Sequence, residues 1–134
     1  MISNRSLVTR VAGIAALAVA SAACWWAWAA GDTTYQVDAV TGTTSGPYAG
    51  WQIAGCVLSL IVVTAVAGAR LPVWVVVPTV TAAFTAAWAA TASSDATGLW
   101  AVGAVMVACG TFLGAAFVAG CAVPVRWARR RLEA

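Results

Sequence analysis

Charged residues in this 134-residue chain stand only where long apolar runs stop, and their sign alternates from one stop to the next. Before the C-terminal cluster, the charged positions are, in chain order, Arg5, Arg10, Asp32, Asp38, Arg70 and Asp95. The fourth run ends in a cluster of arginines between 126 and 131. Because cytoplasmic segments of membrane proteins carry an excess of basic residues, this alternation predicts four crossings of a bilayer with the arginines in the cytoplasm.

The apolar runs have the length that such crossings require. A helix needs about 20 apolar residues to cross a hydrocarbon core about 30 Å thick, and four spans of that kind occupy 11–30, 51–69, 73–92 and 99–123. With 63% hydrophobic and 8% charged residues, a soluble bundle would be apolar on all its outer faces. We therefore expect an all-α integral membrane protein: one domain, 1–134, with four transmembrane helices in a compact bundle and both termini cytoplasmic.

The composition also indicates which membrane the protein occupies. Lysine is absent, every basic residue is arginine and alanine is abundant, which is typical of a GC-rich bacterial genome. We therefore expect a multi-pass protein of the bacterial inner (plasma) membrane. The segment 20–24, Ala-Ser-Ala-Ala-Cys, resembles a lipoprotein cleavage site, but the chain stays apolar beyond Cys24, which favours an uncleaved first span.

The connections between spans are unequal. Only the outer loop 31–50 is long enough to hold structure of its own, and its Thr, Val and Tyr residues permit either a short hairpin around Thr41 and Gly42 or an irregular linker. The connection around Arg70 and Pro72 is so short that we expect spans 51–69 and 73–92 to be antiparallel neighbours. Spans 11–30 and 73–92 are rich in small residues, which predicts that they lie inside the bundle.

The tryptophans agree with the expected orientation. Two fall at the inner boundary, Trp74 and Trp127, and six fall towards the outer one, namely Trp25, Trp26, Trp28, Trp51, Trp88 and Trp100. Amphipathic rings prefer the headgroup level, so anchoring is the simplest role for them. An outer-leaflet contact surface is the alternative.

Most kinds of chemistry are excluded by residues that the chain lacks. There is no histidine, and the four cysteines are dispersed without a CxxC pair, so we expect neither a metal site nor a cofactor. No Asp, Glu, Lys or Arg lies within a predicted span, although ion-coupled transporters usually place a charged residue there. The basic residues are divided among the ends of separate spans and do not form one continuous basic face, which argues against nucleic-acid binding. We expect no enzymatic activity.

Two features of the spans suggest helix contacts or a path. Gly103, Gly110 and Gly114 recur on one face of span 99–123, and the last two form a GxxxG pattern that permits close helix packing within the chain or, less readily, between copies. Pro78 should kink span 73–92. Thr81 and Thr85, close to that kink, could line a permeation path, with ordinary packing as the simpler alternative.

Two further features concern the membrane boundaries. Cys24 and Cys56 are predicted at equal depth, roughly 8–9 Å below the outer boundary at about 1.5 Å per residue. Equal depth is necessary for a disulfide but does not establish contact, and two buried thiols that pack as small apolar groups are the simpler alternative. The basic tail 124–134 should contact anionic lipid at the inner surface, through the residues Arg126, Arg129, Arg130 and Arg131. The same charges also determine topology.

These observations predict a function by elimination. The leading expectation is a non-enzymatic accessory or interaction subunit in the lipid bilayer, which binds itself or a membrane protein partner through small-residue helix faces. The alternative is an oligomeric pore or transporter for an uncharged or apolar solute.

Overall fold

Helices dominate the computed structural model of the chain, which describes residues 4–29, 36–37, 39–45, 50–94 and 97–134. Four long helices are formed: α1 (Asn4–Trp28), α2 (Gly50–Arg70), α3 (Val73–Ala92) and α4 (Trp100–Glu133). Each is long and apolar enough to cross a membrane. The predicted class, an all-helical chain of four apolar helices suited to a membrane bundle, is confirmed.

The helix bounds follow local sequence signals. Pro72 adopts φ −66° and ψ 144° and directly precedes α3, where its carbonyl accepts hydrogen bonds from the N–H groups of Val75 and Val76. Gly98, before α4, has a φ of +69°, a backbone conformation that side chains with a Cβ rarely adopt. The chain therefore reverses sharply on both sides of α3.

Two helices are longer than the predicted spans. α1 begins at Asn4 rather than at 11, and α4 continues through Pro124 and the arginine cluster to Glu133. At about 1.5 Å per residue, α4 is about 50 Å long, well beyond the hydrocarbon thickness of about 30 Å. The basic tail 124–134 is thus a helical extension of the last span.

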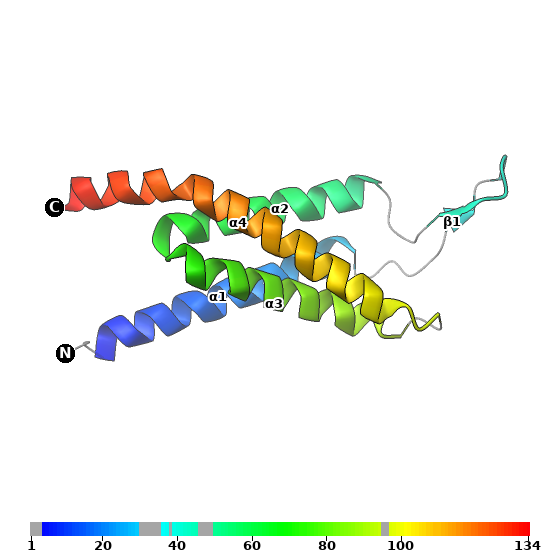
Figure 1. The fold of residues 1–134 in the computed structure, drawn as a ribbon, viewed down its shortest axis with the longest axis horizontal. Helices are drawn as coiled ribbons and strands as arrows, with labels where there is room; N and C mark the ends of the chain where they lie inside the picture. Colours follow the sequence, from blue (N-terminus) through cyan, green and yellow to red (C-terminus); the bar gives the residue numbers. More distant parts are fainter. Residues whose placement is uncertain (1–3, 30–35, 38, 46–49, 95–96) are drawn as a thin grey trace.

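Figure 1 shows both termini and the α2–α3 turn at one end of the bundle, with the other connections at the opposite end. In the outer loop, β1 (Gln36–Val37) pairs antiparallel with β2 (Thr44–Ser45), with Gln36 opposite Ser45 and Val37 opposite Thr44. Gly42, between the strands, has a φ of +68°. Of the two alternatives for this loop, the short hairpin is the one formed; Asp32 and Asp38 lie outside the described residues.

The helices form a ring in the order α1, α2, α4, α3, in which each helix packs against its two ring neighbours. The expectation that α2 and α3 are close neighbours is wrong, because they lie diagonally and touch only slightly. The turn that joins α2 and α3 contacts both α1 and α4. Leu71 lies 3.9 Å from the position of a Cβ at Gly13 of α1, and the Arg126 guanidinium of α4 donates a 3.0 Å hydrogen bond to the Leu71 carbonyl.

Two apolar clusters fill the ring. One lies towards the end with the termini and combines Leu17, Val76, Val80 and Ala119; the other lies towards the hairpin and contains Cys24, Trp25, Cys56 and Ala87. α1 pairs with α3 through these clusters. Both helices nevertheless keep most of their surface exposed and are less buried than α2, so the expectation that these two spans lie inside the bundle is not confirmed.

Candidate functional site

Three glycines mark the places where helices approach most closely. A Cβ on Gly55 would lie 2.6 Å from Trp28 Cζ3, and one on Gly103 would lie 2.5 Å from Trp88 Cη2. A Cβ on Gly68 would lie 3.2 Å from Ala119 Cα, where α2 and α4 meet. At each of these points the missing side chain leaves room for an aromatic ring or a neighbouring backbone, which is how helices associate in lipid.

Gly110 and Gly114, the predicted GxxxG pair, are different. A Cβ on either would meet nothing within 4 Å among the described residues. The predicted contact within the chain is therefore found for Gly103 but not for Gly110 and Gly114. Contact of this pair with another molecule stays a prediction.

The open glycines form one wall of a groove between α2 and α4, which we call the α2–α4 groove. Its part nearer the hairpin has a volume of about 340 Å³ and is bounded by Gly110 and Gly114 on α4, by Val57 and Ile61 on α2, and by Phe84 of α3 at its base. The Thr64 hydroxyl in this wall donates a 2.7 Å hydrogen bond to the Leu60 carbonyl. This part of the groove is thus almost wholly apolar.

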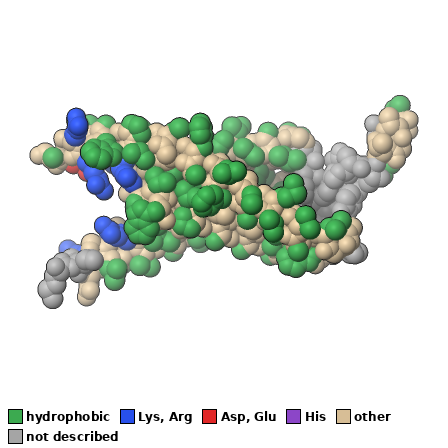
Figure 2. Space-filling view, in the orientation of Figure 1, with side chains coloured by type: hydrophobic (Ala, Val, Ile, Leu, Met, Phe, Trp, Pro, Cys, Tyr) green, Lys and Arg blue, Asp and Glu red, His purple; other side chains and the backbone are tan. Residues whose placement is uncertain are grey.

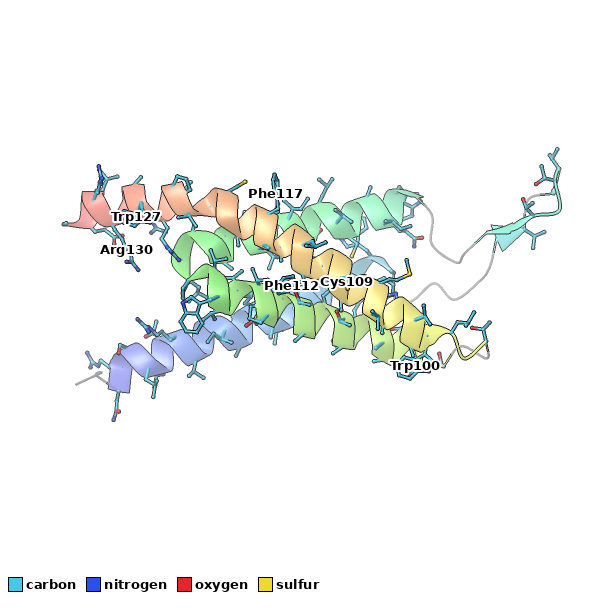
Figure 3. The ribbon with its side chains drawn as sticks, viewed as in Figure 1. Trp100, Cys109, Phe112, Phe117, Trp127 and Arg130 are labelled. Carbon is cyan, nitrogen blue, oxygen red and sulfur yellow. The ribbon has the colours of Figure 1, made fainter. Side chains whose placement is uncertain are left out.

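A second hollow of about 540 Å³ continues along the same seam as far as Ala69 and Val125. Ile61, Phe117 and Val118 line both hollows, so the two hollows adjoin along the seam between α2 and α4. Figure 3 shows Phe117 projecting from α4, and this side chain is 74% exposed. From Gly110 to Val125 the groove extends over about 20 Å of helix, taking about 1.5 Å per residue.

Pro78, Thr81 and Thr85 occupy one side of α3 but line neither of these hollows. The Thr79 hydroxyl next to the proline donates a 2.7 Å hydrogen bond to the Val75 carbonyl. The hydroxyl oxygens of Thr81 and Thr85 are buried and have no hydrogen-bond partner among the described residues. Trp88, one turn further on, packs on Gly103, so this side of α3 faces α4. A role of these residues in a path stays a prediction.

Cys24 and Cys56 are buried in the same apolar cluster, and both are free thiols. The equal depth inferred from the sequence agrees with this placement, and the free thiols correspond to the alternative without a disulfide. Cys109 and Cys121 are exposed on α4.

The arginines all lie at the end of the molecule that carries both termini, as Figure 2 shows. Arg126 is half-buried and bound to the Leu71 carbonyl, whereas Arg129 forms a 3.9 Å ion pair with Glu133 one turn further along α4. Arg130 and Arg131 are exposed in the last turn of α4. The four tail arginines are thus in different environments, which the sequence did not predict.

Several tryptophans that were expected to anchor the outer boundary pack within the bundle instead. Trp25 is 7% exposed, and its Nε1–H donates a 3.1 Å hydrogen bond to the Thr91 hydroxyl of α3. Trp28 donates a 3.0 Å hydrogen bond to the Ser59 hydroxyl of α2. Trp26, Trp51 and Trp100 are exposed. A glycine or a hydroxyl residue on the facing helix is the sequence signal that could have distinguished the packed tryptophans from the exposed ones.

Within the described part of the chain, no three His, Cys, Asp or Glu residues come together in a way that could hold a metal ion. Four apolar helices, an apolar lateral groove and a basic end together have the pattern of a multi-pass membrane protein. No family model, curated protein or solved structure matches the chain.

Proposed function

We propose that this protein is a non-enzymatic subunit of a membrane-protein complex that binds a transmembrane helix of a partner protein in the α2–α4 groove. The observation that carries the proposal is the open pair of glycines, Gly110 and Gly114, on the wall of an apolar groove. Such a pair lets a second helix backbone approach closely, and dispersion contacts from that approach drive association in lipid.

The rest of the bundle supports this use of the groove. At Gly55, Gly68 and Gly103 the space left by the glycine is occupied by a ring or a backbone of the same chain. At Gly110 and Gly114 the same kind of space is open. The groove is also elongated along two helices, a shape that suits another helix.

The test is a pair of bulky substitutions on the same helix. Gly114→Leu would fill the groove, whereas Gly120→Leu adds the same side chain at a glycine that lines neither hollow and has open space around it. Each variant would be cross-linked in native membranes and purified with its partners. We expect a stoichiometric partner with the parent chain and with Gly120→Leu, and its loss with Gly114→Leu. Equal recovery with both variants would contradict the proposal, and retention of lipid alone would assign the groove to an acyl chain.

For location, we propose the bacterial inner membrane with both termini in the cytoplasm and the hairpin outside. The gathering of the arginines at the end with the termini supports this orientation. The tail arginines, from Arg126 to Arg131, would then lie against the anionic inner leaflet.

A second candidate is an oligomeric pore for an uncharged or apolar solute, with Pro78, Thr81 and Thr85 near the path. The hydroxyls of Thr81 and Thr85 favour it, because they are buried without a hydrogen-bond partner among the described residues. A buried hydroxyl is usually hydrogen-bonded, and an uncharged polar solute could supply the partner in transit. A pore predicts self-association and solute flux after reconstitution of the chain alone. A subunit predicts no flux when it is reconstituted alone.

A further inference from the structure

The two longest helices extend beyond the α2–α3 turn at the end that carries the termini. Gly13 of α1 and Arg126 of α4 both lie against Leu71, so these two residues mark the level of the turn. Beyond that level, α1 continues towards Asn4 and α4 continues to Glu133. Figure 2 shows a hollow between the two projecting ends, with basic side chains on both sides of it.

The periodicity of the buried faces shows which arginines border this hollow. On α1, the buried residues Leu17, Ser21 and Cys24 form one stripe, and Arg10 continues it one turn beyond Gly13. On α4, the buried residues Ala115, Ala119 and Ala122 form a stripe that Arg126 continues and that Arg129 and Arg130 flank on either side.

The two helices lie diagonally in the ring and do not touch along their described ranges. The bundle-facing stripes of α1 and α4 therefore face one another across the hollow, with the turn at Leu71 as its floor. Figure 3 shows Arg130 on the side of α4 that faces α1.

We propose that this basic cleft, formed by Arg10 on one side and by Arg126 and Arg130 on the other, binds the phosphate headgroup of an anionic phospholipid. Guanidinium groups match phosphate oxygens in geometry and keep their charge at every physiological pH. Arg129 is paired with Glu133, while Arg10 and Arg130 have no ion-pair partner among the described residues.

The position of the cleft favours a lipid over a soluble anion. The cleft begins where the apolar bundle ends, and Trp74 and Trp127, at the same end, are 78% and 61% exposed. Exposed tryptophans at that level are typical of the headgroup region, and basic pockets between transmembrane helices on the cytoplasmic side suit lipid headgroups. The inference rests on the cytoplasmic orientation proposed above, but not on the partner helix in the α2–α4 groove.

Each helix supplies a matched control for the test. Arg5 lies on α1 away from the stripe that contains Arg10, and Arg131 lies on α4 on the side opposite Arg126. The variants Arg10→Gln and Arg130→Gln remove a charge from the cleft, whereas Arg5→Gln and Arg131→Gln remove the same charge from its outside. The full-length variants would be delipidated in a neutral detergent, titrated with phosphatidylglycerol or phosphatidylcholine, and weighed by native mass spectrometry.

We expect one phosphatidylglycerol to be retained in preference to phosphatidylcholine. Arg10→Gln and Arg130→Gln should each weaken its retention about fivefold, the change expected for one arginine near an anionic headgroup. Arg5→Gln should retain it as the parent chain does, and Arg131→Gln, which removes only the general attraction of the tail to anionic lipid, should weaken its retention less than Arg130→Gln does. Equal weakening by all four variants would show diffuse attraction and overturn the cleft, as would equal retention of the two lipids. Displacement of phosphatidylglycerol by millimolar inorganic phosphate would assign the cleft to the free ion and overturn the lipid assignment.

Discussion

The variant Gly55→Ala tests the packing of α1 against α2, because it adds a single methyl group at their contact. The added Cβ would lie 2.6 Å from Cζ3 and 2.7 Å from Cε3 of the Trp28 ring, whereas carbon atoms pack best at about 3.5–4.0 Å. The ring would therefore have to retreat by roughly 1 Å. It is held in place by the hydrogen bond from its Nε1 to the Ser59 hydroxyl and by an edge contact with Trp51, with ring centroids 6.2 Å apart.

The magnitude follows from three contributions. Overpacking in a filled core destabilises a protein by about 1–3 kcal/mol, and a hydrogen bond between membrane helices contributes about 0.6 kcal/mol. Alanine favours the helix over glycine by up to about 1 kcal/mol, which offsets part of the loss. We expect Gly55→Ala to lower the free energy of unfolding by about 1–2 kcal/mol, the balance of these terms.

The assay is unfolding of the detergent-solubilised protein by sodium dodecyl sulfate, followed by circular dichroism. Gly120→Ala is the matched control, because its Cβ would meet nothing within 4 Å among the described residues, and we expect its stability to be unchanged or raised. In a Trp28→Ala background, Gly55→Ala should lose its destabilising effect, since the ring it displaces is absent. If Gly55→Ala and Gly120→Ala unfold at the same detergent fraction, Trp28 does not constrain this position and the packing argument fails.

Four further predictions test two hydrogen bonds, the state of two thiols and the orientation of the chain. Trp25→Phe and Thr91→Val each remove the same 3.1 Å hydrogen bond, so each should lower the free energy of unfolding by about 0.6 kcal/mol. Because the two variants remove one bond, the double variant should lose less than the sum of the single losses, and additive losses would show that the bond does not contribute. Arg126→Gln removes the hydrogen bond that fixes α4 to the Leu71 carbonyl, and it should accelerate proteolysis of the α2–α3 turn while Arg131→Gln does not. Non-reducing mass spectrometry should find Cys24 and Cys56 as free thiols, and a cross-linked pair of peptides that contain these two residues, lighter by two hydrogens, would establish the disulfide instead. A reporter fused after Ala134 should be active only in the cytoplasm, and a periplasmic signal would reverse the orientation.

The sequence predicts the middle helices almost to the residue, because their ends coincide with the ends of their apolar runs. α2 and α3 begin and end within one residue of the predicted spans. α1 and α4 run further, because hydropathy marks the part of a helix that lies in lipid and not the helix itself. Arginine, leucine, alanine and glutamate are good helix formers, so α4 continues through Arg126 and Arg130 as a helix.

The arrangement of the helices is less accessible to sequence reasoning. A short turn at Pro72 makes α2 and α3 antiparallel, but it does not decide whether they touch or stand across a ring. That choice depends on α1 and α4, which contact the turn through Gly13 and Arg126 and separate the two helices. Similarly, a GxxxG pattern is visible in the sequence, while the emptiness of the space beside Gly110 is visible only once α2 and α4 are placed.

The diagonal placement of α2 and α3 has a consequence for the order in which the chain assembles. Helices that enter a membrane as a consecutive pair can pack together at once only if their surfaces match, and these two have few contacts. α1, which enters first, contacts both of them and can hold a three-helix intermediate together. The ring closes when α4 arrives and covers Gly68 and Trp88. Without α4, both residues would lack this cover, so the last helix completes the surfaces of α2 and α3 that the first three helices leave open.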